Sequence, residues 1–210
     1  MTYAPVPSAH HRAGATVIGH METTKATLLH YVVDARASRF TVQAFAIGIL
    51  SAMGHNPRIG IRTFSGEVDF DAEAAQACRF RLSMKSNSVG VLDDISDKDR
   101  REIERIMNEQ VLESSKYPEI VYEAPTVSIK HIEGNLYSAT LVGTLSFHGV
   151  THNRSIPARI ASFDHMVRAS GEFTLNQSDY GIKPISIAGG AMKVKDELKF
   201  SFEIVARKQE

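Results

Sequence analysis

Alternation of apolar and polar residues dominates the chain from Leu28 onward, and it restricts the fold more than any other feature of the sequence. The longest alternating face consists of Tyr137, Ala139, Leu141, Gly143, Leu145 and Phe147. Further faces occur within 28–34, 40–44, 64–70, 78–84, 120–122, 127–129, 156–160, 167–175 and 198–205. Successive side chains of a β-strand point to opposite sides of the sheet, so this pattern predicts strands that bury one face.

Turn-forming residues separate the predicted strands. They lie at 133–135, 162–164 and 195–197, where Gly, Asn, Asp or Ser interrupts the alternation. The links are short enough for hairpins, and the chain has too few predicted helices for the crossovers that a parallel sheet needs. The sequence therefore predicts a mainly β fold with eight or so antiparallel strands.

One segment departs from the period of two and predicts a single amphipathic helix from about 97 to 113. Ser96, followed by Asp99 three residues later, is a variant of the capping box, and Pro118 closes the segment. Its apolar face consists of Ile103, Ile106, Met107 and Val111. Its charged face consists of Arg100, Arg101, Glu104, Arg105 and Glu109, and we expect it to be solvated.

Strand length favours a closed barrel over a sandwich. The predicted strand at 136–148 would extend about 40 Å at ~3.3 Å per residue. A strand of this length must bend or coil, and Gly143 offers a bend point. Long coiled strands are typical of an up-and-down barrel, whose interior is either packed or an apolar cavity. The alternation alone does not distinguish these two interiors.

Charge and cysteine content narrow the classes of function. The 24 Lys and Arg residues balance the 24 Asp and Glu residues without a long basic run, so we expect no nucleic-acid partner. A net charge of zero gives little repulsion between copies, and we expect a homodimer. The single cysteine, Cys78, excludes an intrachain disulfide and a Cys-based zinc site. The apolar runs fall far short of the ~20 residues that span a bilayer, so we expect no membrane span.

The first 26 residues differ in character from the rest. Residues 1–26 contain Pro5, Pro7 and Gly14, and they predict a mobile leader or arm, whereas 27–210 predict a single β domain. The leader lacks the basic start and the apolar run of ~7–15 residues that form a secretory signal. A cytoplasmic location is therefore the default expectation.

The sequence contains no phosphate loop, dinucleotide fingerprint, nucleophile elbow or metal-binding helix motif, so we expect no enzyme. His148 and His152 flank a predicted strand junction, and together with His55 they could bind zinc or copper. The alternative interpretation places these histidines at turns, bonded to the backbone. Their spacing matches no specific chelate, so we expect no metal, and a small His-based metal protein or enzyme remains the alternative function.

Six segments, in the same order, resemble motifs of the YceI-like family of lipid- and isoprenoid-binding barrels. They are YVVDARASRF at 31–40, FSGEVDFD at 64–71, KYPEI at 116–120, GTLSFHGVT at 143–151, NQSDYGI at 176–182 and VKDEL at 194–198. The resemblance covers about residues 30–207. It implies an extended, eight-stranded antiparallel, lipocalin-like barrel with a channel for an isoprenoid, quinone or fatty-acyl chain. It also implies that most members have no established catalysis and that some dimerise.

The leading hypothesis is therefore a non-enzymatic protein that binds, transports or stores a long apolar ligand without a resident cofactor. The predicted cavity is lined by Phe40, Val42, Phe80, Leu82, Met84, Leu141, Leu145, Phe173, Phe200 and Phe202, with Ile103, Ile106 and Met107 closing one side. A β-bulge would reverse which side chains of a strand face inward. A packed barrel that acts as an interaction module through its helix and leader is the third interpretation.

Overall fold

The computed structural model describes residues 29–47, 56–70, 78–187 and 192–209, so the predicted leader lies outside the described residues. The elements in chain order are β1 (Leu29–Val33), β2 (Arg39–Gln43), β3 (Ala46–Ile47), β4 (Arg58–Ile61), β5 (Phe64–Phe70), β6 (Cys78–Lys85), η1 (Ser86–Ser88), β7 (Val89–Val91), α1 (Asp97–Ile106), η2 (Met107–Val111), β8 (Glu119–Glu133), β9 (Leu136–Phe147), β10 (Val150–Phe163), β11 (Met166–Asn176), η3 (Gln177–Tyr180), β12 (Ser186–Ile187), β13 (Met192–Val194) and β14 (Glu197–Lys208).

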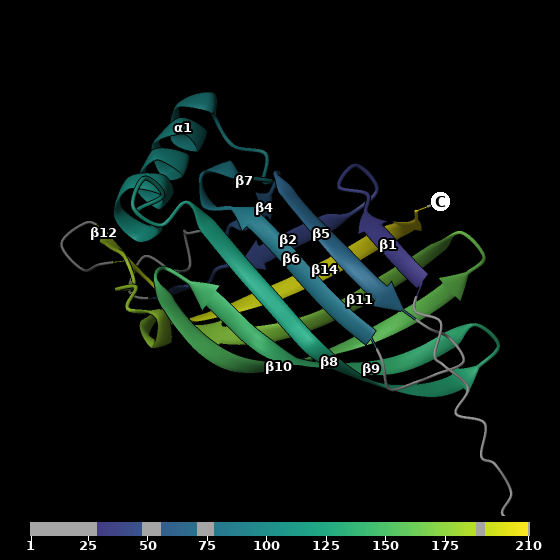
Figure 1. Cartoon of the computed structure of the whole chain (residues 1–210). Coiled ribbons are helices and arrows are strands. Elements are labelled where there is room, and N and C mark those ends of the chain that lie inside the picture. Colours follow the sequence, from purple (N-terminus) through teal and green to yellow (C-terminus); the bar gives the residue numbers. More distant parts are fainter. Residues whose placement is uncertain (1–28, 48–55, 71–77, 188–191, 210) are drawn as a thin grey trace, which may run out of the picture.

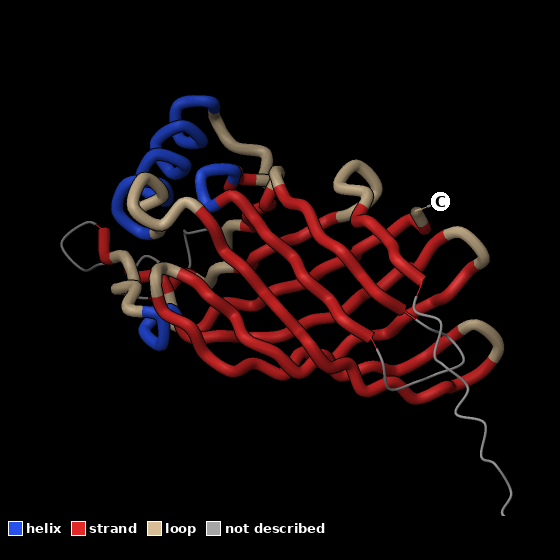
Figure 2. The backbone as a smooth tube through the Cα atoms, viewed as in Figure 1, coloured by secondary structure: helices blue, strands red, loops and turns tan. Residues whose placement is uncertain are grey.

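Eight of these strands form a closed antiparallel barrel. Their order around the ring is β1-β5-β6-β8-β9-β10-β11-β14, and β14 pairs back with β1. The strands cross the barrel obliquely, with α1 at one end and the β8–β9 and β10–β11 turns at the other (Figures 1 and 2). The mainly β, eight-stranded antiparallel barrel that the alternation, the strand lengths and the family resemblance together predict is confirmed.

Short strands extend the ring at the α1 end. β2, β4 and β7 continue the sheet from β14 in the order β14-β2-β4-β7, and β12, β13 and β3 form a separate three-stranded sheet. The alternation predicts only β2 among these, because strands of two to four residues are too short to show a period. The turn predicted at 162–164 starts later than expected, since β10 continues to Phe163.

Asp34 and Ser38 fasten the turn between β1 and β2 to β14. The Asp34 amide donates to the Val205 carbonyl over 2.8 Å, and the Val205 amide donates to Ser38 Oγ over 2.9 Å. Arg207 Nε donates to the Asp34 carboxylate over 2.8 Å, and this hydrogen bond lowers the pKa of Asp34. β14 can therefore pair with β2 over one half and with β1 over the other, which closes the ring.

The predicted helix forms α1 and continues as the π-helical turn η2 to Val111. Ser96 caps it as predicted, because its side chain accepts the Asp99 amide hydrogen over 3.1 Å. The charged face is not wholly solvated, however. Glu104 accepts the Val91 amide hydrogen over 3.0 Å, and Arg100 donates to the Val91 carbonyl, so this face fastens α1 to β7. None of the described helices is long and apolar enough to cross a membrane.

Gly143 lies where β8 presses against β9. The register of this pair shifts between Glu123 and Thr126, which marks a β-bulge. A Cβ atom on Gly143 would lie 1.9 Å from the Glu123 carbonyl oxygen and 2.7 Å from the Ala124 Cα atom. The predicted bend point is thus a position where two backbones approach too closely for any side chain.

We expect Gly143→Ala to destabilise the barrel by about 3 kcal/mol, because backbone atoms of a paired strand cannot move aside as a flexible side chain can. Urea unfolding followed by circular dichroism measures this change. Gly134→Ala is the matched control, since Gly134 has a φ of 53° and no neighbour within 4 Å of an added Cβ. It meets only the steric cost of placing a Cβ on a left-handed backbone, about 1 kcal/mol. Equal losses in the two variants would contradict this account of the bulge.

Candidate functional site

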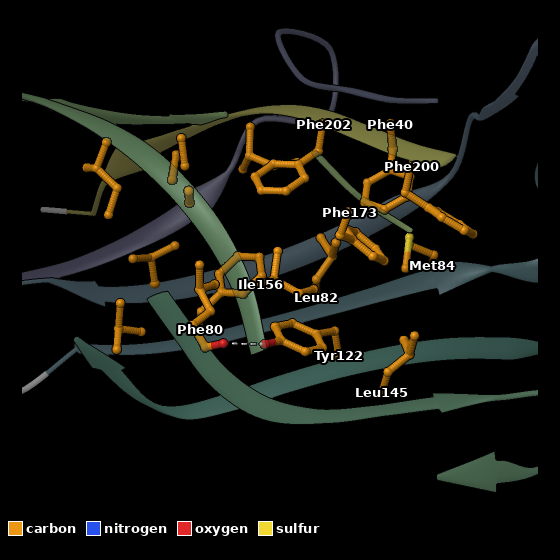
Figure 3. Close-up of a pocket in the computed structure, with 18 of the residues that line it drawn as sticks. Phe40, Phe80, Leu82, Met84, Tyr122, Leu145, Ile156, Phe173, Phe200 and Phe202 are labelled. Atoms are coloured by element: carbon orange, nitrogen blue, oxygen red, sulfur yellow. Dashed lines mark hydrogen bonds between the residues drawn. The ribbon is translucent and has the colours of Figure 1, made fainter. Parts of the chain in front are cut away.

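The inner faces of the barrel strands enclose an apolar cavity of about 90 Å³ (Figure 3). Residues from β2, β4, β5, β6, β8, β9, β10, β11 and β14 line it. Among these described residues, Arg79 is the one charged side chain and Tyr122 is the one other polar side chain. The cavity can therefore make dispersion and hydrophobic contacts along almost its whole surface.

Nine of the thirteen residues predicted to line the cavity do so. They are Phe40, Phe80, Leu82, Met84, Leu141, Leu145, Phe173, Phe200 and Phe202. Their strands come from positions far apart in the sequence, and the period of two brings each onto the inner surface of the ring. Figure 3 shows eight of these nine, all except Leu141, labelled around the same space.

The other four predicted residues, Val42, Ile103, Ile106 and Met107, are not part of this lining. Val42 is buried, but it pairs with Ile59 of β4 as well as with β14, so it belongs to the sheet extension. Met107 is buried in the hydrophobic core, and Ile103 packs against that core. The helix is fastened to β7, and its apolar face therefore covers the core near the sheet extension without closing the side of the cavity.

The prediction missed many lining residues that the same alternation contains. Examples are Val68, Phe70, Ile120, Ile129, Phe147, Ile156, Ile160, Val167, Leu175 and Ile204. In β8, the inward side chains are Tyr122 and Ala124 before the bulge and Val127 and Ile129 after it. The change of parity between Ala124 and Val127 is a signal that the printed sequence already carries.

Four phenylalanines from three strands form an aromatic cluster on the cavity wall. The Phe173 ring stacks on Phe200 with centroids 4.9 Å apart, and Phe40 lies 6.2 Å from Phe200 and 6.3 Å from Phe202. The pairing of Phe40 with Phe202, and of Phe173 with Phe200, across neighbouring strands brings these rings together. Large rings from adjacent strands thus occupy much of the interior that shorter side chains would leave open.

Tyr122 places a hydroxyl group inside this apolar wall, and backbone carbonyls satisfy it. Its Oη lies 3.0 Å from the Leu141 carbonyl oxygen and 3.0 Å from the Arg154 carbonyl oxygen, and its single proton is shared between them. Figure 3 draws one hydrogen bond from the Tyr122 hydroxyl inside the apolar wall. Burial raises the pKa of Tyr122 to about 12, so the hydroxyl stays protonated at ordinary pH. It serves the structure of the β8–β9–β10 region and is not poised as an acid or base.

Of the three histidines considered for a metal site, two contact backbone carbonyl groups and the third lies at an undescribed position. His148 Nδ1 lies 3.1 Å from the Tyr180 carbonyl oxygen, and His152 Nε2 lies 2.9 Å from the Asp179 carbonyl oxygen. Both contacts are to the backbone of η3, which agrees with the alternative interpretation that these histidines lie at turns and bond to the backbone. His55 lies outside the described residues. Over the described ranges, no group of three or more His, Cys, Asp or Glu side chains could hold a metal ion.

Several solved structures share this fold at low sequence identity. A polyisoprenoid-binding domain from Saccharophagus degradans, implicated in plant cell wall breakdown, is 14% identical with a TM-score of 0.64, over 87% of this chain and 100% of that domain. BcnA from Burkholderia cenocepacia is 18% identical with a TM-score of 0.61, over 82% of this chain and 98% of that one. The YceI protein of Campylobacter jejuni is 17% identical with a TM-score of 0.55, over 75% and 88%.

Sequence comparison gives the family. No curated protein matches the chain. The family model described as the YceI-like domain matches residues 31–206, which contain six of the eight ring strands completely and most of β1 and β14. The chain therefore belongs to the YceI-like domain family.

Proposed function

We propose that this protein is a non-enzymatic carrier that binds a long apolar ligand, such as an isoprenoid, quinone or fatty-acyl chain, inside its barrel. The observation that carries the proposal is the lining: an enclosed surface contributed by nine strands whose side chains are apolar except for Arg79 and Tyr122. Membership of the YceI-like family supports it, as does the structural similarity to the polyisoprenoid-binding domain from Saccharophagus degradans.

Hydrophobic burial alone is strong enough for useful affinity. A chain of ~20 methylenes, at ~0.8 kcal/mol for each buried methylene, gives ~16 kcal/mol before costs. Ordering the ligand and removing its translational freedom cost ~4–15 kcal/mol. A net gain therefore remains without a specific polar contact, and the chemistry of such a site calls for no catalytic residue.

The size of the cavity implies that the lining moves when a long ligand binds. An engineered apolar cavity of ~150 Å³ accommodates about one benzene molecule. The space inside this barrel is about 90 Å³, which is too small for an extended isoprenoid or acyl chain. We infer that the ligand displaces side chains of the aromatic cluster, Phe40, Phe173, Phe200 and Phe202, and takes their place along the wall.

Replacing Leu82 by arginine tests the proposal. Leu82 is 3% exposed and lines the cavity. An arginine there would either occupy the volume that the ligand needs or place a positive charge in the apolar wall. We expect the dissociation constant for a fluorescent long-chain fatty acid to rise by about a hundredfold or more. Titration by fluorescence measures the constant, and circular dichroism measures folding.

Two further variants keep this test decisive. Val142→Arg is the matched control, because Val142 is 47% exposed on the outer face of β9 and the same charge there leaves binding unchanged. Ala169→Phe narrows the cavity with an apolar ring, and we expect about tenfold weaker binding even if the arginine variant fails to fold. Unchanged affinity in folded Leu82→Arg and in Ala169→Phe would refute the proposed site.

We also propose that the protein forms a homodimer. Its net charge of zero leaves little long-range repulsion between two copies, and the two-fold dimer is the commonest oligomer of soluble proteins. Light scattering at micromolar concentration should give a mass near twice 23.1 kDa. A mass of one chain that stays constant on dilution would contradict this proposal.

A further inference from the structure

The end of the barrel opposite α1 carries two neighbouring hairpins (Figures 1 and 2). They are the β8–β9 hairpin, which turns between Glu133 and Leu136, and the β10–β11 hairpin, which turns between Phe163 and Met166. The Ser162 amide donates to the Asn135 carbonyl over 2.9 Å, so the two turns are joined. We call these two turns and their flanking residues, 130–136 and 159–168, the hairpin tips.

The hairpin tips expose large apolar side chains. Six large hydrophobic residues are exposed in the described part of the chain, and three of them lie here: Ile132 at 55%, Leu136 at 41% and Phe163 at 44%. Leu136 pairs with Ala161, two residues before Phe163, so Leu136 and Phe163 share the outer face. Ile132 falls at a register shift of the β8–β9 pair. Apolar side chains gathered on one exposed edge mark an interaction surface.

Positive charges lie beside these apolar side chains, one step further from the turns. Arg168 pairs with Ala161, and Arg159 lies two residues before Ala161 on β10. Both guanidinium groups therefore share the outer face with Phe163. Lys130 and Lys208 add two more positive charges at the same end of the barrel. The turns themselves carry two acidic residues, Glu133 and Asp164. Among the described residues, none of Lys130, Arg159, Arg168 and Lys208 forms an ion pair.

The lining of the cavity reaches this end of the barrel. Ile160 pairs with Tyr137, and Val167 pairs with Ser162, so both lining residues stand within a few positions of the turns. An apolar edge, a band of cations behind it and an apolar cavity beside it match the layers of a bilayer with anionic headgroups. A ligand that is itself lipophilic resides in such a bilayer.

We propose that the hairpin tips dock on an anionic lipid bilayer, with Ile132, Leu136 and Phe163 entering the interface and Arg159 and Arg168 contacting the headgroups. This inference rests on the proposed function, because docking here brings the cavity lining against the membrane in which an apolar ligand is dissolved. It adds an interaction surface that ligand binding in solution does not require.

The sequence contains no tryptophan, so a single introduced tryptophan reports its own surroundings. We expect the emission of Phe163→Trp to shift to the blue when vesicles of equal parts phosphatidylglycerol and phosphatidylcholine are added, and to shift less with phosphatidylcholine alone or at high salt. Val142→Trp is the control, because that position on the outer face of β9 is equally exposed but lies away from the tips. No shift in Phe163→Trp, or an equal shift in Val142→Trp, would overturn the docking surface.

A double variant separates this inference from the function on which it rests. We expect Ile132→Ser with Phe163→Ser to lower co-sedimentation with the anionic vesicles by about tenfold while the affinity for the fluorescent fatty acid in solution stays unchanged. Undiminished co-sedimentation would refute docking through the tips and leave the carrier function standing. Loss of fatty-acid binding in Leu82→Arg bears only on the cavity. Conversion of a dimer to a monomer by the double variant, without vesicle binding by the parent protein, would make the tips a contact between copies and would also refute docking.

Discussion

Closure of the ring by β14 is the constraint on which the other features depend. β14 pairs with β11 along one edge, and along the other edge it pairs first with β2 and then with β1. The change of partner is possible because Ser38 and Asp34 bond the backbone of Val205 at the point where the chain leaves β1. Since every ring strand then has two neighbours, the apolar face of each can point only inward, and an enclosed apolar interior follows.

The sequence predicts the ring well and its interruptions poorly, for a physical reason. Alternation is set by the two faces of each strand, so the period alone predicts an inward position for Phe80, Leu145 and Phe200, and all three line the cavity. Val42 has the same period and is buried like Phe40, but it lies further along β2, beside β4 and outside the cavity lining, because which neighbour a strand meets depends on contacts remote in sequence. The same holds for α1: helical spacing identified its apolar face, but the bond from Glu104 to β7 decided where that face lies.

The chemistry of the interior agrees with binding more than with a reaction. The hydroxyl of Tyr122 donates its hydrogen bond to two backbone carbonyl groups near the β-bulge, and its raised pKa keeps it protonated. The remaining wall offers contact area and aromatic rings such as Phe173 and Phe202. A narrow space lined by side chains that can rotate gives affinity through burial, with little selection of the ligand by directional bonds. Exposed apolar residues at the hairpin tips then suggest how such a ligand is reached.

Native mass spectrometry of the gently purified protein tests most directly whether the barrel holds a long apolar ligand. The account predicts an added mass that corresponds to a lipophilic molecule, that is lost on extraction with organic solvent, and that is regained when a long-chain isoprenoid or fatty acid is supplied. A protein whose mass equals that of the bare chain, before and after exposure to such molecules, would contradict the account. An added mass of one zinc or copper ion in place of a lipid would contradict it as well, in favour of a histidine site that includes His55.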